Sequence, residues 1–224
     1  MQSKAIPEHQ NFYMNRLLQS LGEKYNTDKH DEIHSFAGKT YLDVYEDHFS
    51  SIKDSTTCLL ELGVLHGKSL MMWRDYFQNA QIWGLDIDPS TKQDYGKRID
   101  VIIGNQCNKN DLDRVAVGQG FDIIIDDASH LVDHIIQSFK LLWPRIKTKG
   151  YYCIEDTGCS YTENLEPYKN LWPGMKYNLE NTNYKNDRRK LERFFLDLIK
   201  QIDFKSSNVR GVYFTTYQCI IQKL

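Results

Sequence analysis

Strand-like and helix-like segments alternate along this chain from residue 58 onward, and this alternation limits the possible folds more than any other feature. Residues 68–77 and the segment that begins at residue 131 carry helical patterns. Short apolar runs typical of buried strands lie at residues 58–64, 81–87, 101–104, 122–127 and 151–155. Because strands that alternate with helices build a parallel sheet covered on both faces, we predict an α/β, doubly wound (Rossmann-like) fold.

The C-terminal part is predicted to complete that sheet. Residues 191–202 have apolar positions at helical spacing, and residues 213–222 suit two strands joined by a tight turn, which could form an antiparallel edge. We therefore expect a mostly parallel seven-stranded sheet with an antiparallel C-terminal strand, formed by residues 52–224. Residues 1–51 are expected to add a helical lid or oligomerisation segment to this single domain. Residues 162–187 are polar, and segments of that length are usually functional or disordered.

Composition excludes several classes of protein. A hydrophobic content of 41% and a charged content of 26% are ordinary for a soluble globular domain. The formal net charge of -2 gives no general attraction to nucleic acid or to an anionic membrane. No run approaches the ~20 apolar residues of a membrane span, and the N-terminus has no apolar stretch of signal-peptide length. The five cysteines show no C-x-x-C spacing. We expect a cytoplasmic protein without nucleic-acid or membrane partners.

Pairs of carboxylates end two of the predicted strands. Asp126 and Asp127 close one strand, and Glu155 and Asp156 follow the next. Because the carboxyl ends of parallel strands meet at one edge of a sheet, these acids are expected to lie together. Hard oxygen ligands favour magnesium, calcium or manganese, although the same spacing also suits a helix cap. His130 has the titration range of a general base, but a histidine at a helix start also suits a surface position.

A glycine turn after the first predicted strand indicates a nucleoside site. Gly63 lets the backbone approach a ligand at the start of a helix, and Asp86, at the end of the next strand, can accept hydrogen bonds from both ribose hydroxyls. A dinucleotide site would need Gly-x-Gly-x-x-Gly, but Leu65 occupies the second glycine position. Glu61 would repel a pyrophosphate and suits a cofactor that carries an ammonium group. S-adenosylmethionine (SAM) is therefore favoured over NAD.

Seven short motifs occur in an order that is more specific than any one of them. They lie at residues 27–29 (Thr-Asp-Lys), 41–45, 60–63, 69–73, 84–88, 122–130 and 154–156. Together they resemble the magnesium-dependent class I methyltransferases that methylate sugar hydroxyls, the family of the macrocin and mycinamicin O-methyltransferases, with the cephalosporin-hydroxylase-like proteins as relatives. The resemblance runs from about residue 24 to the C-terminus.

This resemblance implies a division of roles among the site residues. Asp127, Glu155 and Asp156 would hold magnesium, and His130 would be the general base that deprotonates the metal-held hydroxyl. The residues implied to contact SAM are Glu61, Gly63, Ser69, Asp86, Asn105, Gln106, Asp126 and, from an N-terminal segment that covers the cofactor, Tyr41. A homo-oligomer is also implied, since that segment could reach a neighbouring site.

We therefore expect a SAM- and magnesium-dependent O-methyltransferase that acts on a carbohydrate hydroxyl. The acceptor would be a sugar nucleotide, a glycan precursor of polysaccharide biosynthesis or a glycosylated natural product, and an acceptor smaller than a macrolide suits this compact chain. Two alternatives remain open: methyl transfer to nitrogen or to another small-molecule hydroxyl, and a Rossmann-like module that binds nucleotides without catalysis. Methylation of nucleic-acid bases is disfavoured because the motif Asp-Pro-Pro-Tyr is absent.

Overall fold

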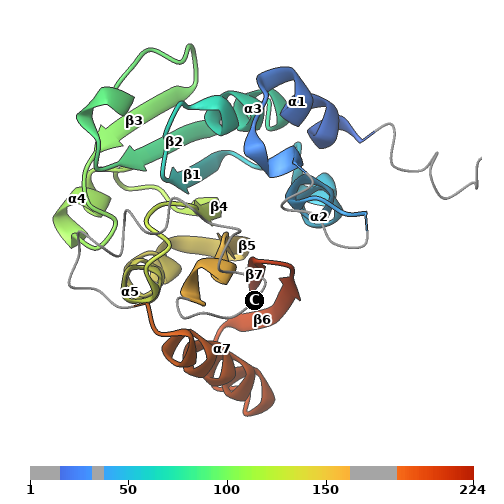
Figure 1. Cartoon of the computed structure of the whole chain (residues 1–224), viewed down its shortest axis with the longest axis vertical. Coiled ribbons are helices and arrows are strands. Elements are labelled where there is room, and N and C mark those ends of the chain that lie inside the picture. Colours follow the sequence, from blue (N-terminus) through green and yellow to red (C-terminus); the bar gives the residue numbers. More distant parts are fainter. Residues whose placement is uncertain (1–15, 32–37, 162–185) are drawn as a thin grey trace, which may run out of the picture.

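The computed structural model describes residues 16–31, 38–161 and 186–224. They contain a seven-stranded sheet with the strand order β3-β2-β1-β4-β5-β7-β6 (Figure 1). The strands are β1 Cys58–Leu62, β2 Gln81–Asp86, β3 Ile99–Ile103, β4 Phe121–Asp126, β5 Ile146–Ile154, β6 Val209–Thr215 and β7 Gln218–Lys223. Neighbours from β3 to β5 run parallel, whereas β7 is antiparallel to both β5 and β6. The predicted doubly wound, mostly parallel sheet is confirmed.

The antiparallel strand β7 lies one position inside the edge of the sheet. The sequence suggested an antiparallel edge, but the edge strand is β6, which runs in the same direction as β5. The reason is burial: β7 carries the fully buried Cys219, Ile220 and Ile221, whereas β6 has mostly half-buried and exposed side chains. A tight turn between Thr215 and Gln218 places the more apolar strand against β5.

Side chains alternate between two hydrophobic clusters, because successive strand residues point to opposite faces of the sheet. In β1, Leu60 and Leu62 join one cluster and Leu59 the other. The first cluster also contains residues of α5 (Val132–Leu142) and α7 (Arg188–Asp203), and the second contains residues of α1 (Leu17–Tyr25), α2 (Tyr41–Phe49) and α3 (Lys68–Tyr76). The short α4 (Lys109–Asp113) follows β3. In the described ranges, no helix is both long and apolar enough to cross a membrane.

The described part of the N-terminal segment contributes to the second cluster. Helix α2 begins at a capping box, in which the Thr40 side chain accepts a hydrogen bond from the Asp43 backbone and the Asp43 side chain accepts one from Thr40. Its Leu42, Tyr45 and Phe49 side chains are fully buried. The segment therefore packs against the sheet and brings side chains to its carboxyl edge, whereas a lid or oligomerisation role remains a prediction.

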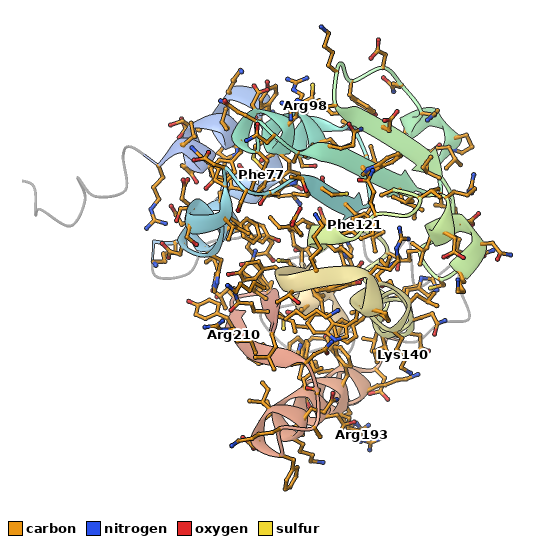
Figure 2. All side chains as sticks on the ribbon, turned by 180° about the vertical axis from the view of Figure 1, so that it is seen from behind. Phe77, Arg98, Phe121, Lys140, Arg193 and Arg210 are labelled. Carbon is orange, nitrogen blue, oxygen red and sulfur yellow. The ribbon has the colours of Figure 1, made fainter. Side chains whose placement is uncertain are left out.

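Arg98 fixes the C-terminal end of α3 to the start of β3 (Figure 2). Its guanidinium donates to the backbone oxygens of Phe77 at 3.0 Å, Ala80 at 2.7 Å and Arg74 at 2.8 Å. The last carbonyls of a helix have no partner within the helix, so the bond to Arg74, in the last turn of α3, satisfies one of these acceptors. Arg98 thus holds the C-terminal end of the helix that follows the glycine turn.

Candidate active site

Two adjoining cavities lie at the carboxyl edge of the sheet. The larger has a volume of about 690 Å³ and the smaller of about 350 Å³. Gly63, Asp86 and Ala128 line both of them. Ligands of open α/β sheets bind at the carboxyl ends of the strands, and β1 lies between β2 and β4, where the strand order reverses.

Gly63 brings the turn after β1 close to the loop after β4. Its φ of +87° lies in the left-handed region, and a Cβ at this position would be 2.1 Å from the backbone oxygen of Asp127. Only glycine allows this approach, so the two loops contact each other at the wall of the larger cavity. The sequence led us to expect a close approach of this backbone to a ligand, and the contact of Gly63 with SAM remains a prediction.

Asp86 is fixed at the junction of the two cavities. Its Oδ2 accepts from the backbone N–H groups of Val64 at 2.7 Å and Leu65 at 3.2 Å, and its Oδ1 accepts from that of Asp88 at 2.9 Å. Three backbone donors hold the carboxylate in one orientation, and each oxygen keeps further capacity to accept. The position suits a group that contacts the hydroxyls of a bound nucleoside.

Asn105 and Gln106 line the smaller cavity, but Asp126 turns away from it. The Asp126 carboxylate is buried and accepts hydrogen bonds from Gln106 Nε2 at 3.1 Å, Ser138 Oγ at 2.6 Å and Tyr152 OH at 2.8 Å. Burial raises the pKa of Asp126 to about 6. Asp126 therefore holds the side chain of Gln106, which lines the cavity, by a hydrogen bond. Its own contact with the cofactor remains a prediction.

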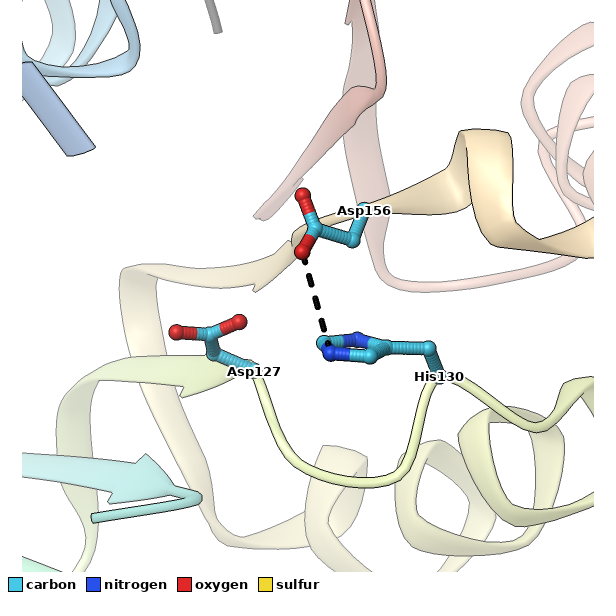
Figure 3. A group of neighbouring side chains, drawn as sticks. All are labelled: Asp127, His130 and Asp156. Atoms are coloured by element: carbon cyan, nitrogen blue, oxygen red, sulfur yellow. Dashed lines mark ion pairs between the residues drawn. The ribbon is translucent and has the colours of Figure 1, made fainter. Parts of the chain in front are cut away.

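Asp127, His130 and Asp156 converge at one end of the larger cavity (Figure 3). One potential ligand atom from each residue lies within 4.8 Å of the others. His130 Nε2 is 3.7 Å from Asp156 Oδ2. The φ angles of His130 (+55°) and Asp156 (+52°) are both positive, in the left-handed region that His and Asp adopt more often than most other non-glycine residues. The two carboxylates suit a divalent cation such as Mg²⁺ or Mn²⁺, which prefers oxygen ligands, and the imidazole lies beside them.

Glu155 differs from the arrangement expected of a metal ligand. Its Oε1 accepts from Tyr45 OH at 2.6 Å and its Oε2 accepts from Lys29 Nζ at 2.7 Å. Its side chain is buried beside Lys29, outside the group formed by Asp127, His130 and Asp156. The cationic partner of this carboxylate in the structure is the buried ammonium of Lys29, where we expected a metal ion.

Tyr41 and Glu61 contact other residues of the site. Tyr41 OH donates to Asp156 Oδ1 at 3.0 Å, so the structure places Tyr41 on the carboxylate side of the cavity. Glu61 Oε2 accepts from Ser69 Oγ at 2.8 Å, and its Oε1 is 3.4 Å from Lys29 Nζ, an ion-pair distance. Burial raises the pKa of Glu61 to about 7, although Lys29 acts in the opposite direction. Ser69 lines the larger cavity, so Glu61 is connected to that cavity by its hydrogen bond with Ser69.

Sequence reasoning assigned no role to three residues that organise this site. Lys29 and Tyr45 belong to motifs that carried the resemblance, and that was the available signal. Asn186 gave no signal, yet its amide donates to the backbone oxygens of His130 at 3.1 Å and Cys159 at 3.0 Å, and its Oδ1 accepts from Val132 N at 2.8 Å. These bonds join the loop after β4 to the turn η7 (Thr157–Ser160) after β5.

Comparisons with known proteins agree with the motifs. A family model of a methyltransferase domain matches residues 60–157. Mycinamicin VI 2''-O-methyltransferase of Micromonospora griseorubida is 36% identical over 166 residues, covering 70% of this chain and 38% of the relative. Demethylmacrocin O-methyltransferase of Streptomyces fradiae is 32% identical, with coverage of 70% and 38%. The chain thus spans less than half the length of these curated relatives.

Solved structures agree with the fold. The MycE methyltransferase of the mycinamycin biosynthetic pathway, solved with Mg, SAH and mycinamycin VI, superposes with a TM-score of 0.68 at 30% identity, covering 94% of this chain and 55% of that chain. SAH-bound PaMTH1 of Podospora anserina, at 16% identity and a TM-score of 0.58, covers 100% of this chain and 99% of its own, and supports the fold alone. The class I methyltransferase fold and the resemblance predicted from the motifs are confirmed.

Proposed function

We propose that this chain, which has the class I methyltransferase fold and is similar to sugar O-methyltransferases, transfers a methyl group from SAM to a carbohydrate hydroxyl with the help of a divalent cation. One observation carries this proposal. The cavity lined by Gly63 and Asp86 is also lined by Asp127, His130 and Asp156, so a nucleoside cofactor, a cation and an acceptor would meet in one space.

The two cavities suit the two ends of the cofactor. Asp86, held by backbone donors where the cavities join, would accept the ribose hydroxyls. Asn105 and Gln106 would contact the adenine in the smaller cavity. Gly63 and Ser69 would face the methionine part in the larger one, which extends to the acids after β4 and β5.

Asp127 and Asp156 offer the carboxylate oxygens that would hold Mg²⁺, and the MycE structure contains this ion. When bound there, a divalent cation supplies a Lewis acid that orients the acceptor hydroxyl and lowers its pKa. Glu155 contacts Lys29 and Tyr45, and its predicted role as a third ligand stays a prediction.

His130 would remove the proton of the acceptor hydroxyl. The acceptor oxygen attacks the methyl carbon of SAM, the bond between that carbon and sulfur breaks, and its electron pair stays on sulfur. The hydroxyl proton passes to His130, whose Nε2 is 3.7 Å from Asp156 Oδ2. The Asp156 carboxylate would stabilise the resulting imidazolium, as an acid beside a catalytic histidine does elsewhere.

The acceptor class comes from the relatives, whose names specify methylation of sugar positions on natural products such as mycinamicin VI and a rhamnosyl tetracenomycin. We propose a sugar hydroxyl on a sugar nucleotide, a glycan precursor or a glycosylated natural product. An acceptor of this kind carries neighbouring hydroxyls that can face the Asp127–Asp156 end of the cavity.

Mass spectrometry of purified protein incubated with SAM, Mg²⁺ and a panel of sugar nucleotides and glycosides tests this function. We expect one acceptor to gain one CH₂ unit, and the product to disappear with EDTA or in Asp127→Asn. Binding of SAH without turnover on any acceptor would favour the alternative of a nucleotide-binding module.

The role of His130 as a base can be separated from a role as a metal ligand. We expect His130→Asn to lower kcat by about 10²–10⁴-fold while Mg²⁺ affinity, measured by calorimetry, stays within about threefold. A parallel loss of Mg²⁺ affinity would show that His130 acts as a ligand. Full activity in this variant would contradict both roles.

A further inference from the structure

Lys29 is a buried cation among the acids of the site. It lies in the turn η2 (Asp28–His30), and its side chain is only 2% exposed. Its Nζ donates to Asp127 Oδ2 at 2.5 Å and to Glu155 Oε2 at 2.7 Å. The Oε1 of Glu61 is 3.4 Å away. The ammonium group therefore joins the ends of β1, β4 and β5, although Lys29 precedes all three strands in the sequence.

The geometry matches the bonding capacity of an ammonium group. Lys29 Nζ has three donors and lies within ion-pair distance of three carboxylates, one from each strand end. The other oxygen of Glu155 accepts from Tyr45, so this carboxylate is held from both sides. The contact to Asp127 uses only Oδ2, which leaves Oδ1 for a ligand.

We propose that Lys29 is a positioning residue, whose ammonium fixes the carboxylates of Asp127 and Glu155 so that a divalent cation meets a preformed site. This inference rests on the proposed function. Groups that orient metal ligands from behind are the usual reason that a ligand keeps one rotamer in the absence of metal. Lys29 orients these carboxylates through its positive charge, because Asp127, Glu155 and Glu61 would otherwise repel one another at close range.

Burial explains why the site needs an internal cation. Glu61 and Glu155 are 0% and 2% exposed, so water cannot compensate their charges. Breaking a buried pair by removing one partner leaves the other charge without compensation. Loss of the ammonium should therefore release the Asp127 carboxylate from its orientation toward the cavity.

Calorimetric titration of Mg²⁺ into the SAH-saturated protein tests this role in Lys29→Met, which removes the ammonium group and keeps an unbranched side chain only one atom shorter. We expect the Mg²⁺ affinity to fall about 10- to 100-fold, with SAH affinity within about threefold of the parent. Lys24→Met is the matched control, because Lys24 precedes the same turn but its ammonium contacts Asp75 at the surface. It should match the parent in both titrations.

The outcomes separate this inference from the proposed function. A parent protein that binds no Mg²⁺ would contradict the metal part of the proposed function. A parent that binds Mg²⁺ and a folded Lys29→Met that binds it equally well would overturn only the role of Lys29.

A crystal structure of the parent protein with Mn²⁺ and SAH tests the inference even if Lys29→Met does not fold. We expect Lys29 Nζ to stay within hydrogen-bond distance of Asp127 and Glu155 while the ion, located by its anomalous signal, contacts Asp127 and Asp156. An ion that displaces Lys29 from Asp127 would overturn the proposal.

Discussion

Gly63 sets how closely the two loops of the site approach each other. Because glycine has no side chain, the backbone oxygen of Asp127 can approach it closely. A Cβ at position 63 would lie only 2.1 Å from that oxygen. Backbone cannot move aside as a flexible side chain can, so a methyl group here must separate the turn after β1 from the loop after β4. The same separation would shift Asp127 relative to the cofactor cavity.

We predict that Gly63→Ala abolishes SAH binding and lowers the free energy of unfolding by at least about 2 kcal/mol more than Gly118→Ala. Gly118 is a matched control, because its φ of +74° imposes similar backbone strain but a Cβ there would meet no atom within 4 Å. Urea unfolding and calorimetry measure both effects. Equal losses of stability in the two variants would show that backbone strain alone is responsible.

Among the helices, α1 is joined to α3 by a cluster around Asp75. The Asp75 carboxylate accepts from Lys24 Nζ at 2.8 Å, from Arg74 Nε at 3.0 Å and from the Tyr25 hydroxyl. Burial alone would raise its pKa, but these donors lower the pKa of Asp75 to about 2. This link holds α1 against α3 near the protein surface.

We predict that Asp75→Asn lowers the free energy of unfolding by about 1 kcal/mol at neutral pH, a small value because the cluster is partly exposed to solvent. Since the folded-state pKa lies below the ordinary value, the stabilisation is full above about pH 4 and is lost as the pH falls toward 2. The difference between parent and variant in urea unfolding should shrink over that range. A constant difference would assign the effect to packing.

The elements that the sequence predicted best are those with a local signal. The parallel strands and α3, α5 and α7 follow from apolar periodicity, and Gly63 and Asp86 follow from their places at strand ends. The position of β7 inside the edge depended on comparing the burial of two strands, which periodicity alone does not show. The partners of Glu155 could not be predicted, because Lys29 and Tyr45 lie more than a hundred residues away in the sequence.

Across the whole molecule, the site is assembled from segments that range from Lys29 to Asn186. Lys29 comes from the turn η2. Gly63 and Asp127 follow the central strands, and Asn186 joins the loops after β4 and β5. A ligand that contacts several of these segments therefore stabilises the entire fold, because unfolding any part removes its binding site.

We predict that SAH at about 100 times its Kd raises the thermal midpoint of the parent by about 5–10 °C, since such binding contributes about 2.7 kcal/mol in a domain of this size. Mg²⁺ should add a further increase that EDTA reverses. Asp86→Asn should lose most of the SAH effect, because a carboxylate that accepts from two ribose hydroxyls becomes an amide with one acceptor. Differential scanning calorimetry measures all three. If SAH raised the midpoint of Asp86→Asn as much as that of the parent, the cofactor would bind elsewhere than at the junction of the two cavities.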